Sequence, residues 1–134
     1  MTSIVVVEGI GEAYADKLRA IGVSTCEKLL AHGASSQGRK ELADKTGISD
    51  KLILEWVNHV DLFRIKGVQQ EYADLLEEAG VDTVPELAQR NPGNLFDKLV
   101  AVNEAKKLVR QLPTRAKVAD WTEQAKHLPR VITY

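Results

Sequence analysis

The chain has 134 residues, of which 44% are hydrophobic and 28% charged, as in an ordinary globular protein. No apolar run approaches the roughly 20 residues of a membrane span, and no basic stretch precedes the short apolar segment at residues 3–7. We therefore expect a cytoplasmic protein with no membrane partner. Cys26 is the only cysteine, which excludes an intrachain disulfide.

The net charge of −1 conceals an uneven distribution. Residues 1–93 carry 10 Lys/Arg against 15 Asp/Glu, whereas residues 94–134 carry 8 against 4. A nucleic-acid binder usually presents a basic face, and only the C-terminal third of this chain is rich enough in cations to form one.

The first half is predicted to be mostly helical, after an extended β-branched entry segment at residues 3–7. Gly22 should end the first helix as a left-handed C-cap, Ser24 with Glu27 forms a capping box, and Ser49 caps the fourth helix. Residues 62–65 are expected to be extended. The predicted helices are residues 11–21, 24–32, 37–45 and 50–59.

The second half repeats this plan. Gly80 should end its first helix, Thr83 with Glu86 forms a second capping box, and Pro113 should end the third helix. Residues 91–94 are predicted to be a turn and residues 130–134 to be extended. The predicted helices are one that follows the turn at residues 67–69 and runs to 79, and then residues 83–89, 95–111 and 114–127.

An internal duplication organises the chain. Gly9 and Gly67 are 58 residues apart, whereas Trp56 and Trp121 are 65 apart, so the second copy is about seven residues longer, with the extra residues expected around 94–106. We predict an all-α fold with about eight short helices and short extended termini. It forms a single domain (residues 1–134), built from pseudo-repeats at about 4–64 and 65–134. Residues 131–132 should lie near residues 4–6.

The first turn and helix resemble a known motif. Gly9-Ile10-Gly11, Tyr14-Ala15, Leu18 and Gly22-Val23 resemble the helix–hairpin–helix of DNA-repair and recombination proteins. Nearly the whole chain is similar to a bacterial family of uncharacterised proteins with tandem motifs of this kind. The pieces that carry this similarity are Glu8-Gly9-Ile10-Gly11, Gly38-Arg39, Glu55-Trp56-Val57-Asn58, Ala79-Gly80-Val81-Asp82-Thr83-Val84, Asn103-Glu104, Lys106-Lys107-Leu108-Val109 and Ala125-Lys126-His127-Leu128-Pro129.

The resemblance implies a phosphate-binding turn. In such hairpins, backbone N–H groups at a helix start hold a phosphate oxygen, and glycine allows its close approach. The predicted site residues are Gly9, Ile10, Gly11, Glu12 and Ala13 in the first copy and Gly67, Val68 and Gln69 in the second. Carboxylates at positions 8 and 12 disfavour an anion, so the alternative is a turn that only packs the two halves together.

The C-terminal third supplies a candidate basic surface. Lys106, Lys107 and Arg110 are predicted to share a helix, with Lys106 and Arg110 on one face. This stripe could lie on phosphates or on an acidic protein, and the alternative is a solvated helix face.

No enzymatic site is indicated. The carboxylates lack the spacing of a two-metal nuclease, and the three histidines, interpreted as surface or helix-end residues, have no metal-ligand spacing, so no metal or cofactor is expected. Trp56 and Trp121 should be core anchors. The expected function is non-enzymatic, sequence-independent binding of DNA through the first turn. The alternative is a protein-interaction or scaffold module; the sequence leaves the oligomeric state open.

Overall fold

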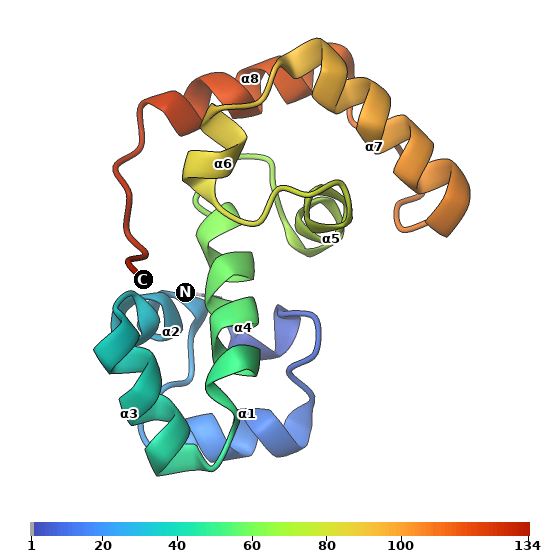
Figure 1. Cartoon of the computed structure of the whole chain (residues 1–134). Helices are drawn as coiled ribbons and strands as arrows, with labels where there is room; N and C mark the ends of the chain where they lie inside the picture. Colours follow the sequence, from blue (N-terminus) through green and yellow to red (C-terminus); the bar gives the residue numbers. More distant parts are fainter. Residues whose placement is uncertain (1) are drawn as a thin grey trace. The chain divides into compact units, whose positions relative to one another are not determined.

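The computed structural model describes residues 2–134 and is all-helical over that range, as predicted (Figure 1). Those residues contain no β-strand, and only an isolated bridge joins Ser3 and Thr25. Across the same range, every helix is too short or too polar to span a lipid bilayer. The elements are the 3-10 turn η1 (Ile4–Val6) and the helices α1 (Glu12–Arg19), α2 (Cys26–Gly33), α3 (Ser36–Thr46), α4 (Asp50–Leu62), α5 (Gln70–Glu78), α6 (Val84–Ala88), α7 (Pro92–Lys106) and α8 (Arg115–Lys126).

The chain divides into two compact units. Unit 1 comprises Met1–Asp61 together with Val131–Tyr134, and unit 2 comprises Leu62–Arg130. The C-terminal segment therefore belongs to the same unit as η1, where the side chain of Ile132 is buried and the Thr133 N–H donates to the Ala34 carbonyl at 2.8 Å.

Two features of the N-terminal region differ from the sequence expectation. Residues 4–6 form a 3-10 turn and not an extended segment. The Ser3 carbonyl accepts the Val6 N–H and the Ser3 hydroxyl accepts the Val5 N–H, so these N–H groups are bonded without a partner strand. The cap of α2 is Thr25, whose hydroxyl accepts the Lys28 N–H at 3.1 Å, and not Ser24.

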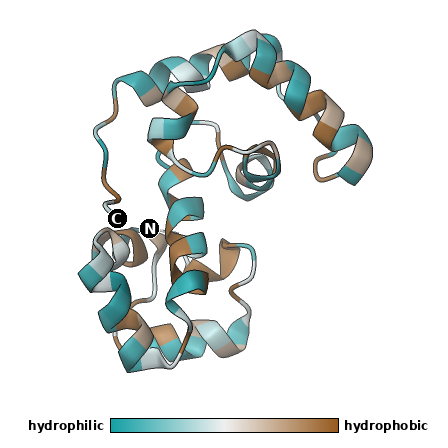
Figure 2. Ribbon diagram, viewed as in Figure 1, coloured by the Kyte–Doolittle hydropathy of each residue, from teal (hydrophilic) through white to brown (hydrophobic). Residues whose placement is uncertain are grey.

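Helices of unit 2 pack around a buried cluster that runs from Leu62 to Ala125. Within it, α6 and α7 pack on α8, and α5 packs on α7. Figure 2 shows hydrophobic and hydrophilic residues interleaved along the helices, as expected when each helix buries one face. The predicted capping box at Thr83 is wrong, because that hydroxyl caps no backbone N–H and Glu86 instead accepts from the Asp82 N–H.

Helix boundaries also shift. α4 continues to Leu62, so residues 62–65 are not an extended stretch, and α7 already begins at Pro92 within the predicted turn. At its other end α7 stops at Lys106 instead of residue 111. The second half of the chain is longer than the first both in α7, with 15 residues against 11 in α3, and in the connection of residues 107–114 in place of residues 47–49.

Candidate nucleic-acid interface

The first turn (residues 8–11) is held by short backbone hydrogen bonds and by burial of the residues around it. The Ile10 N–H donates to the Val7 carbonyl at 3.1 Å, and both of these side chains are buried. Gly9 has φ +91°, in the region that favours glycine. Because the Ile10 side chain points into the core, only its backbone is available to a ligand.

Packing gives a second reason for glycine at position 9. A Cβ there would lie 3.2 Å from Nε1 of Trp56, which is itself buried. The ring of Tyr14 packs on the same tryptophan, with centroids 5.2 Å apart and planes tilted by 59°. Gly9 is therefore required by the fold, and the prediction that Trp56 is a core anchor is confirmed.

Gly11 differs from Gly9 both in its backbone angle and in its packing. It is the N-cap of α1 with φ −82°, a value that any residue can adopt, and no heavy atom lies within 4 Å of the position of a Cβ. No side chain caps the helix start. The N–H groups of Gly11, Glu12 and Ala13 thus begin a helix on an open surface, where an anion can approach.

The charges next to the first turn are mainly acidic. Glu12 is exposed and pairs with Arg19 at 3.3 Å, and the same guanidinium also contacts Asp16 at 3.3 Å. The ammonium of Lys17 lies 5.9 Å from the centre of the Tyr14 ring. The nearby cations are thus already engaged within α1, and an arriving phosphate would meet a carboxylate at position 12.

The second turn (residues 66–69) repeats the backbone geometry of the first. Gly67 has φ +94°, and a Cβ there would lie 3.2 Å from Nε1 of Trp121. Tyr72 packs on that tryptophan with centroids 5.2 Å apart, and the buried Val68 donates its N–H to the Ile65 carbonyl at 3.1 Å. Gln69 occupies the N-cap position of α5, again without a side-chain cap.

The connection between α7 and α8 forms a wall beside the second turn. Lys107 adopts a left-handed conformation with φ +52°, which ends α7. The amide of Asn103 then bonds Val109 twice, accepting its N–H at 3.0 Å and donating to its carbonyl at 3.2 Å. The hydroxyl of Tyr72 donates to the Gln111 carbonyl at 3.0 Å.

These contacts create an open pocket of about 660 Å³ at the second turn, lined by Gly67, Gln69, Gln70, Glu71, Tyr72, Arg110 and Gln111. The structure thus brings Arg110 to two of the predicted turn residues. The prediction that Lys106, Lys107 and Arg110 share a helix is wrong, because α7 ends at Lys106 and Arg110 lies in the connection. Lys106 is ion-paired with Glu78.

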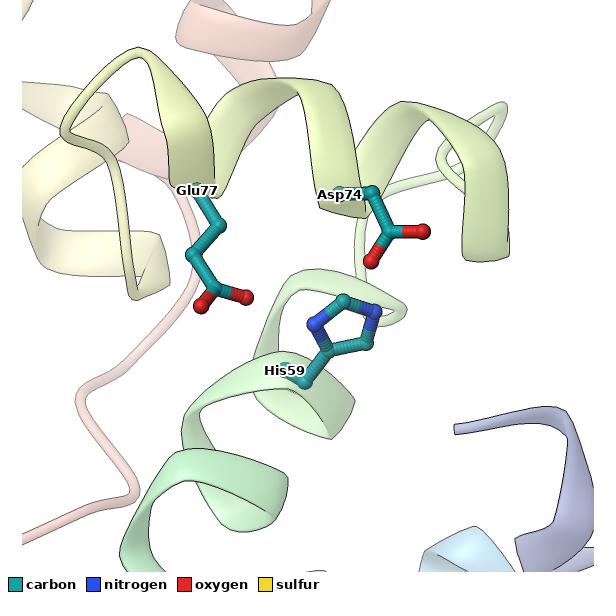
Figure 3. Close-up of side chains that lie close together, drawn as sticks. All are labelled: His59, Asp74 and Glu77. Carbon is teal, nitrogen blue, oxygen red and sulfur yellow. The ribbon is translucent and has the colours of Figure 1, made fainter. Parts of the chain in front are cut away.

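Carboxylates also line α5 behind the second turn. Figure 3 shows Asp74 and Glu77 leaving the same side of that helix. Asp74 accepts hydrogen bonds from the amide of Gln70 at 3.2 and 3.3 Å. Among the described residues that line the pocket, Arg110 is the one cation, and the lining also contains Glu71.

The three histidines occupy the surface or helix-end positions that the sequence suggested. His59, also drawn in Figure 3, lies in the last turn of α4 and is buried there. His32 and His127 are exposed.

Comparison with known protein families supports the similarity of nearly the whole chain to a family of uncharacterised proteins. A family model described as Domain of unknown function (DUF4332) matches residues 8–128. The chain belongs to this family. No match was found among curated proteins or among solved structures. The matched range of this DUF4332 protein includes both turns and the α7–α8 connection.

Sequence reasoning missed the parts of the second-turn pocket that come from Gln70, Tyr72 and Gln111. Pro113 and the greater length of the second copy were the available signals for an irregular segment before α8. They do not indicate that Asn103 would fold the segment back toward the second turn.

Proposed function

We propose that this DUF4332 protein binds nucleic-acid backbone without reading base sequence, and that the two turns belong to tandem helix–hairpin–helix pseudo-repeats. The backbone bonds around the turns support the repeat, since Ile10–Val7 and Val23–Leu18 recur as Val68–Ile65 and Val81–Leu76 with matching lengths. The proposed activity is binding alone, with no catalytic step.

The observation that carries the proposal is Gly11. Neither its backbone angle nor its packing requires glycine, and it opens an uncapped helix onto free space. A phosphate oxygen at that position would accept bonds from main-chain N–H groups and gain from the helix dipole. Contacts of this kind position a protein on the backbone and carry no base information.

Substitution at position 11 separates binding from folding. Gly11→Asp provides a good N-cap but places a carboxylate where the phosphate would lie, whereas Gly11→Asn caps similarly without charge. We expect both variants to be at least as stable as the parent. In fluorescence anisotropy with a labelled DNA duplex, Gly11→Asp should weaken binding about tenfold or more, and Gly11→Asn much less. Equal affinity of Gly11→Asp and the parent would contradict contact at this turn.

A second candidate, a protein-interaction module, is favoured by the acidic surroundings of the first turn. Val5 and Val6 are 37% and 39% exposed, close in sequence to Glu8 and Glu12. An apolar pair beside carboxylates suits a partner with basic and apolar side chains. The same assay distinguishes the two: Glu12→Gln should strengthen duplex binding if phosphate sits at this turn, and an unchanged affinity favours the protein partner.

A further inference from the structure

Unit 1 buries an arginine that has no carboxylate partner. Arg39, on α3, is 6% exposed. Its guanidinium donates to the carbonyls of Gly33 at 2.9 Å, Ala34 at 3.1 Å and Thr133 at 2.7 Å. All three acceptors are neutral, and within residues 2–134 Arg39 forms no ion pair.

Neutral carbonyls compensate this charge only in part. Gly33 and Ala34 end α2, and a helix C-terminus carries the equivalent of roughly half a negative charge. Buried arginines are usually paired with a carboxylate, because removing a full charge from water is costly. A net positive charge therefore remains at this place in unit 1.

An open pocket of about 360 Å³ lies beside the guanidinium. Its lining comes from α3, α4 and the C-terminal segment, and consists of Ser36, Arg39, Lys40, Asp50, Lys51 and Leu54 with Tyr134. Among these lining side chains, three are cationic and one is a carboxylate. Neither Lys40 nor Lys51 is ion-paired within the described part of the chain. The ring of Tyr134, 67% exposed, lies 5.6 Å from the guanidinium carbon of Arg39 and gives the pocket a flat aromatic wall.

We infer that this pocket binds a small phosphate-bearing ligand. The lining side chains carry an excess of positive charge, which suits a phosphomonoester with its charge of about −1.5 to −2 at neutral pH. The volume falls in the range of small-ligand pockets, about 300–1,000 Å³. Arg39 is held rigidly by its three carbonyls, so its charge is pre-organised, while Lys40 and Lys51 can move to the phosphate oxygens.

The inference is independent of the proposed nucleic-acid binding, since it uses no residue of either turn. Isothermal titration of the whole chain with inorganic phosphate and with adenosine 5′-monophosphate, in the absence of nucleic acid, tests it. Adenosine serves as the uncharged control. We expect saturable binding of at least one phosphate compound and none of adenosine. If only the nucleotide binds, the wall at Tyr134 contributes; if both bind equally, the phosphate suffices.

Two sets of variants make the test specific to this pocket. Lys40→Ala with Lys51→Ala should weaken phosphate binding about tenfold or more, whereas Lys28→Ala, an exposed lysine of α2 outside the pocket, should not change it. Asp50→Asn removes the one carboxylate and should strengthen binding. Absence of binding by both phosphate compounds, or equal binding by the double variant and the parent, would overturn the inference.

Discussion

The two turns share a scaffold but differ in what surrounds them. In each, a glycine with φ near +90° packs against a tryptophan nitrogen, and a tyrosine packs on that tryptophan. The first turn is open and has an acidic neighbour in Glu12, whereas the second is walled by residues 107–114 and faces Arg110. The turn itself is thus fixed by local packing, whereas the charge and openness around it are fixed by segments outside the turn.

The largest effect should come from removing the tryptophans. Trp56→Ala and Trp121→Ala each empty a buried aromatic site and should destabilise the affected unit by about 3–5 kcal/mol. Each variant keeps one tryptophan, which lies in the unit that was not changed. The fluorescence of that tryptophan during urea unfolding reports the unchanged unit, whereas circular dichroism reports both units. A cost below about 1 kcal/mol in either variant would break the equivalence of the two turns.

Substituting the turn glycines should have a smaller effect. Gly9→Ala and Gly67→Ala force a side chain into a positive φ and toward an indole nitrogen, and should each cost about 1–3 kcal/mol in urea unfolding. Gly11→Ser is the matched control, since its Cβ meets open space and serine caps a helix well. If Gly11→Ser were as damaging as Gly9→Ala, the assignment of Gly9 to folding and Gly11 to ligand access would be wrong.

The wall of the second turn depends on Asn103. Asn103→Ala removes both of its bonds to Val109 and should cost about 1–2 kcal/mol. Amide hydrogen exchange should accelerate at Val109 and across residues 107–114, with no change in unit 1. The neighbouring Glu104→Ala is the control. Unchanged exchange at Val109 would show that Asn103 does not hold the wall.

The smallest effect should come from Cys26→Val. Val84 follows Cys26 at the same spacing as Gly67 follows Gly9 and is also buried, so the change should cost below about 1 kcal/mol. Burial raises the pKa of the Cys26 thiol from 9.0 to about 11. The stability linked to this thiol is thus complete below pH 9 and lost as pH rises toward 11. At pH 8, a thiol reagent should modify unfolded but not native protein; rapid modification of native protein would contradict this burial.

Local sequence signals predicted most of the fold. Gly22 and Gly80 end helices in the left-handed region, and α3, α4 and α8 begin within one residue of their predicted starts, because caps and apolar periodicity act within a few residues. The errors at residues 4–6 and at the end of α7 have a common cause. Each segment is shaped by hydrogen bonds that apolar periodicity does not reveal. Ser3 bonds the backbone of residues 5 and 6, and Asn103 bonds the backbone of Val109.

The candidate site was less predictable than the fold. The turn residues were identifiable from their glycines, but the position of Arg110 depends on how Asn103 and Tyr72 hold residues 107–114. A helical reading of residues 95–111 placed Arg110 on the face of Lys106, whereas Lys106 pairs with Glu78 and Arg110 faces the second turn. Tertiary contacts therefore decided which cation is available to a ligand.

The salt dependence of duplex binding tests the central claim most directly. Fluorescence anisotropy of a labelled duplex should show log affinity falling linearly with log salt, with a slope of about −0.9 for each phosphate neutralised. Arg110→Ala should reduce the magnitude of that slope by about 1 and weaken binding to all sequences alike, whereas Lys117→Ala, an exposed lysine of α8, should leave it unchanged. No duplex binding at low salt would contradict backbone recognition, and an Arg110→Ala slope equal to that of the parent would contradict phosphate contact at the second turn.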